Sequence, residues 1–260
     1  MLKKVETAIK GVFRKLDLRV TSYSRFDRLK SYERDHASLA FLKALEPQAA
    51  AMVLPYLDQS KAQLHQDLFA WAVSGGKRGG FFVEFGATNG EELSNSWLLE
   101  KRFGWTGILA EPARVWHPEL RANRTAIIET DCVWKTTGDK LEFLEVSAAV
   151  LSTVAEHGDG DLHRGRRKNA TSYEVTTVTL ADMLARHGAP HEIDFLSIDT
   201  EGSEFDILQA FDFSLYRFGC IAVEHNFTEN RARIHALLTK NGYRRVLEEV
   251  SQFDDWYVAS

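Results

Sequence analysis

The stretch of sequence that decides the fold is Phe81-Phe-Val-Glu-Phe-Gly-Ala-Thr-Asn-Gly90. A mostly apolar run, typical of a buried strand, leads directly into two glycines, and a helix is expected from about Glu91 to Arg102. Glycine permits a tight turn and lets the backbone approach a ligand closely. The stretch therefore predicts the first strand, turn and helix of a doubly wound α/β sheet.

The residues inside this stretch indicate which ligand the turn accepts. Gly86 and Gly90 have the spacing G-x-x-x-G rather than the G-x-G-x-x-G of dinucleotide-binding turns, and Glu84 stands at the end of the strand. A carboxylate there would repel a pyrophosphate, but it suits a cationic ligand such as S-adenosylmethionine, which carries an ammonium and a sulfonium. A purely structural glycine turn is the alternative.

Strand and helix patterns alternate through the rest of the chain after Gly80. Such alternation predicts a mainly parallel sheet with helices on both faces. A closing hairpin is expected over 243–250 and 255–259. The other expected strands are 81–85, 106–111, 125–130, 174–179, 193–199 and 220–224, and the other expected helices follow Pro112 and cover 180–187, 203–210 and 230–241.

The N-terminal part of the chain has a different texture. Residues 34–74 have a helical period that is broken at Pro47 and Pro55, and four glycines punctuate residues 75–80. We therefore predict an N-terminal helical region over residues 1–75 and a catalytic domain over residues 76–260.

Residues 2–18 have the pattern of a basic amphipathic helix, because residues 1–20 contain six basic and two acidic side chains. Such a helix can lie on an anionic membrane surface, pair with a second copy of the chain, or pack on its own domain. All three possibilities stay open.

Acidic side chains follow the expected strands at the point where each strand ends. Glu111 comes about 20 residues after the glycine turn, where an acid accepts hydrogen bonds from ribose hydroxyls in doubly wound folds. Asp131 ends the third strand and can meet the adenine amino group, with a solvated strand-end charge as the alternative. Asp199 and Glu201 follow the strand 193–199, and the pair Glu224-His225 follows the next one. The carboxyl ends of parallel strands share one edge of a sheet, so we expect these groups to converge on one crevice.

The last of these groups can carry proton transfer. We expect nearby carboxylates to raise the proton affinity of His225, which makes it the first candidate for a general base, with Asp199 second. A purely structural histidine is the alternative. Three carboxylates, those of Asp199, Glu201 and Glu224, can also share a divalent cation, but their spacing does not establish a metal.

Four segments resemble those of the FkbM-type methyltransferases: FFVEFGATNG, GILAEP, FLSIDTEGSEFDIL and IAVEHN. The resemblance extends from about Gln63 to the C-terminus, and Asp-x-Glu-Gly-x-Glu is its most specific part. It implies a class I methyltransferase (Rossmann-like) fold, with sheet order 3-2-1-4-5-7-6 and S-adenosylmethionine as methyl donor. It also implies O-methylation, usually of a sugar or a polyketide hydroxyl.

The resemblance further implies a role for each matching residue. Glu84, Gly86 and Gly90 line the methionine end of the cofactor, Glu111 meets the ribose and Asp131 lies near the adenine. The whole implied cofactor site is Glu84, Gly86, Ala87, Thr88, Gly90, Glu111, Pro112, Asp131, Cys132 and Asp199, and the residues implied to face the methyl group are Asp199, Glu201, Glu224 and His225.

Composition narrows the choice of partner. The net charge of −5 argues against a nucleic-acid-binding protein, and the absence of a signal-peptide pattern favours the cytoplasm, with a peripheral membrane contact left open.

Cys132 and Cys220 lie in apolar runs, so we expect core thiols. The irregular segment 155–172 is rich in glycine and basic residues, which predicts a cover over an anionic substrate or a plain solvated loop.

Together these features predict an S-adenosylmethionine-dependent O-methyltransferase that acts on a small molecule or glycan. One alternative is a nicotinamide-dependent oxidoreductase, which shares the layout but not the glycine spacing. The other is a non-catalytic, membrane-associated protein that kept the fold. The set of strand-end acids argues against the latter, because idle acids in one crevice repel each other.

Overall fold

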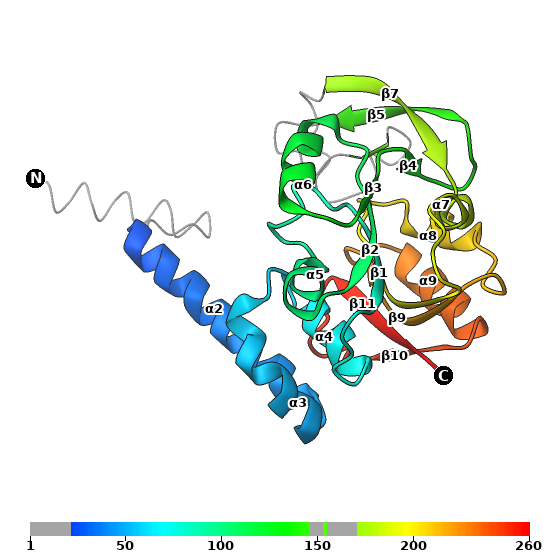
Figure 1. The fold of residues 1–260 in the computed structure, drawn as a ribbon. Coiled ribbons are helices and arrows are strands. Elements are labelled where there is room, and N and C mark those ends of the chain that lie inside the picture. The colour runs from blue at the N-terminus through cyan, green and yellow to red at the C-terminus, as the bar shows by residue number, and fades with distance from the viewer. Residues whose placement is uncertain (1–21, 146–152, 155–170) are drawn as a thin grey trace, which may run out of the picture. The chain divides into compact units, whose positions relative to one another are not determined.

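A computed structural model describes residues 22–145, 153–154 and 171–260 of the chain (Figure 1). The chain divides into two compact units, residues 1–40 and residues 41–260. Helix α2 (Tyr23–Ala44) forms the described part of the first unit and runs into the second. The helix expected over residues 2–18 lies outside the described residues, as does residue range 155–170 of the basic segment, so both stay predictions.

A seven-stranded sheet forms the centre of the second unit, with the order β10-β11-β9-β8-β1-β2-β3. Pairing is parallel from β3 to β9, and β11 is antiparallel to both β9 and β10. Numbered by their place in the chain, the strands read 6-7-5-4-1-2-3 from one edge, which is the expected order seen from the other edge. The bounds are β1 Phe81–Phe85, β2 Thr106–Ala110, β3 Ile127–Glu129, β8 Glu192–Ile198, β9 Arg217–Glu224, β10 Tyr243–Val246 and β11 Asp254–Ala259.

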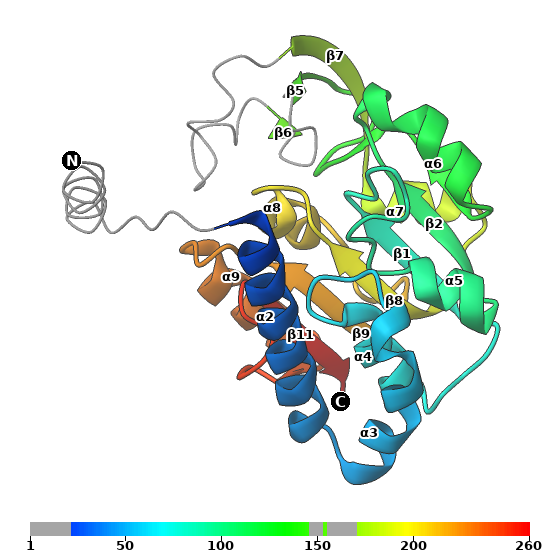
Figure 2. The same ribbon diagram turned by 90° about the vertical axis from the view of Figure 1, so that its left-hand side faces the viewer.

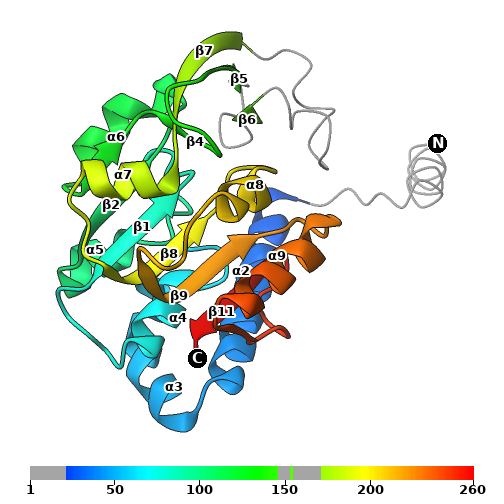
Figure 3. The same ribbon diagram turned by 90° about the vertical axis from the view of Figure 1, so that its right-hand side faces the viewer.

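Helices cover both faces of this sheet, as Figures 2 and 3 show from opposite sides. Alternate residues of each strand point to opposite faces, so Val83 and Val223 pack on one face while Phe82 and Ala222 pack on the other. The first face carries α7 (Leu180–Arg186), α8 (Glu204–Gln209) and α9 (Asn230–Lys240). The second carries α4 (Gln66–Val73), α5 (Trp97–Phe103) and α6 (His117–Asn123).

A second, four-stranded sheet of order β4-β7-β5-β6 was not expected from the sequence. It lies next to α6 at the top of Figure 1 and has its own small apolar core around Trp134 and Phe143. Its strand β7 includes the expected strand 174–179 but begins earlier and pairs outside the main sheet. The bounds are β4 Cys132–Val133, β5 Lys140–Glu145, β6 Thr153–Val154 and β7 Thr171–Val178.

Residues 41–75 share the core of the sheet, so the second unit begins at Phe41 rather than at the predicted boundary between residues 75 and 76. Phe69 of α4 stacks on Trp256 of β11 with ring centroids 4.7 Å apart, and Phe41 meets the same indole edge-on at 6.1 Å. Helix α3 (Pro47–Val53) and the 3₁₀ helix η1 (Leu54–Gln59) complete this part. A helical period shows that a segment has an apolar face but not which core that face joins.

Two further observations concern the helices. Helix α5 begins at Trp97, so the first residues of the helix expected from Glu91 form a turn instead. That turn serves the site described below. Among the described residues, no helix combines the length and the apolar character that a bilayer crossing requires.

Candidate active site

The glycine turn after β1 brings three strand ends into contact. Gly86 has a φ of 72°, and a Cβ atom added there would lie 2.2 Å from the backbone oxygen of Asp199 at the end of β8. The Gly86 N–H donates to the carbonyl oxygen of Ala110 at the end of β2, with an N···O distance of 3.1 Å. Only glycine fits this position, because both the positive φ and the close approach exclude a side chain.

Glu84 is buried and its carboxylate holds the turn that precedes α5. One oxygen accepts from the backbone N–H of Asn95 at 2.8 Å, and the other accepts from the hydroxyls of Ser94 and Ser96. The guanidinium of Arg124 lies 3.9 Å away. The resemblance implied that Glu84 lines the methionine end of a cofactor, whereas in the structure protein groups engage both of its oxygens.

Glu111 ties the glycine turn to the segment after β2. Its two carboxylate oxygens accept from the backbone N–H groups of Thr88 at 2.8 Å and Ala113 at 2.7 Å. Burial raises the pKa of Glu111 to about 7, against the opposing effect of these two bonds. Each carboxylate oxygen can accept more than one bond, so the residue can still receive hydroxyl donors. Ala87 and Glu111 are buried, and Pro112 is half-buried.

Just after β3, Asp131 forms an ion pair with the side chain of Arg186. Its Oδ2 lies 2.9 Å from the Arg186 guanidinium, which also pairs with Glu129 at 2.9 Å. Glu129 also accepts a hydrogen bond from the backbone N–H of Asp131. Through Arg186, both acids are therefore linked to α7. The neighbouring Cys132 is buried, and its burial raises the pKa of the thiol to about 12, in agreement with a core thiol.

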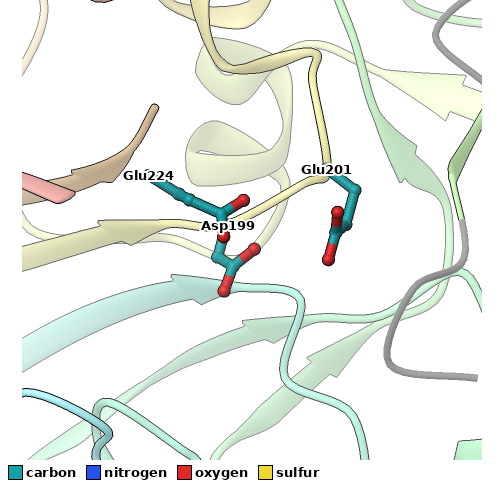
Figure 4. Close-up of side chains that lie close together, drawn as sticks. All are labelled: Asp199, Glu201 and Glu224. Atoms are coloured by element: carbon teal, nitrogen blue, oxygen red, sulfur yellow. The ribbon is translucent and has the colours of Figure 1, made fainter. Parts of the chain in front are cut away.

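Three carboxylates converge beside the glycine turn, where Figure 4 shows Asp199, Glu201 and Glu224 facing one another. One carboxylate oxygen of each lies within 4.8 Å of the others. The side chains of Asp199 and Glu224 share a hydrogen bond, and burial raises the pKa of both. Repulsion from Asp199 raises the pKa of Glu224 further, whereas the shared hydrogen bond lowers that of Asp199. The pair therefore holds one proton at neutral pH, and Glu224 is the stronger holder.

The turn after β8 places Glu201 toward the other two acids. Glu201 is buried and has a φ of 58°, which is uncommon for a residue other than glycine. Glu204 stabilises this turn, because its Oε1 accepts from the backbone N–H groups of Thr200 at 3.0 Å and Gly202 at 2.9 Å. The Asp-x-Glu-Gly-x-Glu element thus contains two acids that face the cluster and one that shapes the loop.

His225 does not join this cluster, although it follows Glu224 directly. Its Nε2 lies 3.7 Å from Asp255 Oδ1, and its Nδ1 accepts from the backbone N–H of Phe227 at 3.0 Å. Burial lowers the pKa of His225, so the expectation of a raised proton affinity was wrong. Neighbouring residues of a strand point to opposite faces, which separates the imidazole from Glu224.

Two residues outside the predicted set lie at the same edge. Asp254, the first residue of β11, stands directly opposite Glu224 in the antiparallel pair, and it accepts from the Gln66 side-chain amide at 2.8 Å. Burial raises the pKa of Asp254 to about 7. Because β11 is antiparallel, its start rather than its end reaches this edge. The closing hairpin expected over 243–250 and 255–259 was the signal that could have pointed there.

Comparison with known families agrees with this geometry. Residues 84–245 match the sequence model of the methyltransferase FkbM domain, which is more than half of the chain. The chain belongs to the FkbM methyltransferase family. The match runs from Glu84 to Arg245, so it includes every predicted site residue of this FkbM methyltransferase and leaves out Gln66 and Asp254.

No curated protein matches the chain. Among solved structures, the chain is similar to the crystal structure of the CurJ carbon methyltransferase, with 11% identity and a TM-score of 0.39. The similarity covers 93% of this chain and 71% of that one.

Proposed function

We propose that this methyltransferase uses S-adenosylmethionine to methylate a hydroxyl oxygen of a small molecule or glycan, with a sugar as the favoured acceptor. The observation that supports it best is the cluster of Asp199, Glu201 and Glu224 beside a turn that only glycine can form. Such a cluster attracts a cation and offers a proton acceptor at the same place.

The order of the strands supports a division of the site into a cofactor half and an acceptor half. The chain reverses direction across the sheet between β1 and β8, which is where doubly wound folds bind ligands. In our proposal the cofactor lies over β1, β2 and β3, with Gly86 and Gly90 at its methionine end, Glu111 at its ribose and Asp131 near its adenine. Ala87, Thr88, Pro112 and Cys132 complete the walls. The acceptor then lies over the ends of β8 and β9, where Asp199 and Glu224 stand.

The chemistry follows from the coupled acids. When bound, the sulfonium supplies an electrophilic methyl group. Asp199, the member of the pair that ionises first, accepts the proton of the acceptor hydroxyl as the new C–O bond forms and the C–S bond breaks. Glu224 keeps its own proton and donates a hydrogen bond to Asp199, which orients the base. General-base assistance of this kind contributes about 10²–10⁴-fold to a rate.

A divalent cation is a second candidate for the same role. Carboxylate oxygens are the ligands that Mg²⁺ and Ca²⁺ prefer, and three of them lie within 4.8 Å of one another here. A bound cation would lower the pKa of the acceptor hydroxyl directly. Removal of metal by EDTA separates the two mechanisms, because a protein base works without metal.

The proposal is tested in two steps. Calorimetry should show that S-adenosylhomocysteine binds and NAD does not, and a methyl-transfer screen over sugar nucleotides and glycans, with and without EDTA, should reveal the acceptor. Binding of NAD alone would favour the oxidoreductase alternative. Transfer of the methyl to carbon or nitrogen acceptors only would contradict the O-methylation part and leave the cofactor part intact.

A further inference from the structure

Residues 60–67, which we call the bridging segment, cross the edge of the sheet where the strands β1, β8 and β9 end. At one side Ala62 forms a parallel bridge with Leu93 of the turn before α5, and Lys61 pairs with Glu91 at 2.9 Å. At the other side Gln66 reaches Asp254 on β11. The segment therefore connects the glycine-turn side of the site with its β9–β11 side.

The amide of Gln66 has a fixed orientation. Its Oε1 accepts from the backbone N–H of Leu64 at 2.9 Å, so its Nε2 faces Asp254 Oδ2, to which it donates at 2.8 Å. The side-chain oxygen and nitrogen of a glutamine are assigned from such partners, and here the partners leave one choice. Both Gln66 and Asp254 are buried, with exposed fractions of 2% and 4%.

Asp254 lies close to the cluster of Asp199, Glu201 and Glu224. Directly opposite residues of an antiparallel pair have Cβ atoms about 4.5–5.5 Å apart and point to the same face, and Asp254 is opposite Glu224. The nearby arginines are engaged elsewhere: Arg124 pairs with Glu84 and Glu100, and Arg231 and Arg245 pair with Asp255.

We propose that Gln66 is a positioning residue of the methyl-transfer site, which holds Asp254 opposite Glu224 so that a fourth carboxylate favours positive charge at the transferring methyl. The inference rests on the proposed function, because it takes the methyl to lie between the glycine turn and Asp199. A hydrogen-bond donor such as the Gln66 amide stabilises the ionised form of the carboxylate that it meets. Gln66 itself has no contact with the reacting atoms in this proposal.

The test compares two cofactor analogues. S-adenosylhomocysteine is neutral at sulfur, whereas sinefungin carries a protonated amine where the methyl of S-adenosylmethionine would be. The ratio of their dissociation constants, measured by calorimetry, therefore reports the negative potential at the methyl position. The wild-type chain should prefer sinefungin. Gln66→Leu should reduce that preference by about threefold or more while the dissociation constant of S-adenosylhomocysteine stays unchanged.

Three further variants make the result specific. Asp254→Asn, which keeps the shape and removes the charge, should reduce the preference as much as Gln66→Leu does. The double variant should reduce it no further, because Gln66 acts through Asp254. Gln63→Leu is the matched control, since Gln63 is an exposed glutamine of the same bridging segment.

The possible outcomes separate clearly. An unchanged preference in Gln66→Leu or in Asp254→Asn overturns the inference, and so does an equal weakening of both analogues, which indicates a structural role. If Gln66→Leu does not fold, Asp254→Asn alone decides. If the wild-type chain binds neither analogue, the proposed function is wrong, and the inference about Gln66 is overturned with it.

Discussion

The imidazole of His225 and the carboxylate of Asp255 face each other on the side of β9 that is turned away from Glu224, with Nε2 and Oδ1 3.7 Å apart. Asp255 is buried and also pairs with Arg231 at 2.8 Å and Arg245 at 3.2 Å. These bonds join β11 to α9 and to β10. His225 thus belongs to a network that packs the end of the sheet, one residue away from the cluster of acids.

This relationship predicts that His225 stabilises the fold more than it serves the reaction. His225→Ala removes the acceptor of the Phe227 N–H and leaves a cavity, so the free energy of unfolding should fall by about 1–3 kcal/mol. The rate of methyl transfer per folded molecule should fall less than about tenfold, since a general base contributes at least 10²-fold. Thermal melting and transfer kinetics on one preparation measure both. A 10²-fold loss in kcat with an unchanged Tm would restore His225 as the base.

The coupled acids should respond unequally to substitution. Asp199→Asn removes the proton acceptor and should lower kcat by about 10²–10⁴-fold with little change in S-adenosylhomocysteine affinity. Glu224→Gln should be milder, because the glutamine amide can still donate a hydrogen bond to Asp199 as the protonated carboxyl does. Transfer kinetics and calorimetry test the pair. Equal losses would speak against the division of roles.

The same pair sets a pH dependence of the rate. Burial raises the pKa of Asp199 to about 6, so the base is protonated at lower pH and transfer should increase as pH rises through about 6. In Glu224→Leu this limb should move to higher pH, because the hydrogen bond that Glu224 shares with Asp199 lowers the pKa of Asp199 and the variant lacks it. A pH–rate profile that keeps its position in this variant would contradict the coupling.

Stability should fall as pH rises through neutrality. Burial raises the pKa of Asp67, Glu111 and Asp254 to about 7, so the folded state keeps protons that the unfolded state releases. The contribution of these groups is complete below their unfolded pKa values and is lost as pH rises through about 7. His225, whose pKa is lowered, acts in the opposite direction only below its unfolded value of 6.5. The Tm should therefore be lower at about pH 8.5 than at about pH 6.5.

Substitution of Asp67 directly tests this pH dependence of the Tm. Its Oδ1 accepts from Ser60 and from the backbone N–H of Leu68, while its buried Oδ2 has no hydrogen-bond partner among the described residues. Asp67→Asn keeps both bonds and removes the titration, so it should raise the Tm at about pH 8.5 and flatten the pH dependence. Asp58→Asn, at an exposed position nearby, is the control. A lower Tm in Asp67→Asn at that pH would show that the buried carboxylate is stabilising.

The sequence indicated where acids would gather but not which way each side chain points. Strand ends such as Asp199 and Glu224 follow from alternating strands and helices, because parallel strands end at one edge. The face of His225 depends on the register of β9 against β8 and β11, which a local pattern does not contain. Gln66 and Asp254 are 188 residues apart in the sequence, so neither segment alone predicts their contact. The small sheet of β4 to β7 escaped prediction because β4 and β6 have only two residues each, and because β7 pairs with β4 and β5 rather than with the main sheet.

Gly86 allows the sharpest test of the turn, because Gly104 is a matched control. Both have a positive φ, 72° and 70°, so alanine at either position incurs the same backbone strain of about 1 kcal/mol. They differ in space: a Cβ on Gly86 would lie 2.2 Å from the Asp199 backbone oxygen, whereas in the described part of the chain no atom beyond the neighbouring residues lies within 4 Å of one on Gly104. Gly104→Ala should therefore lower the Tm modestly and leave cofactor affinity unchanged.

Gly86→Ala should push the end of β1 away from Asp199, lower the Tm further and abolish binding of S-adenosylhomocysteine in calorimetry. Asp199 directly follows β8, a paired central strand, so its backbone oxygen cannot yield as a flexible side chain would. Gly86→Ser adds the same Cβ and should fail in the same way, which excludes an effect peculiar to alanine. If Gly86→Ala binds S-adenosylhomocysteine with wild-type affinity, the turn is not the cofactor site. The proposed position of the methyl group beside Asp199 would then also be wrong.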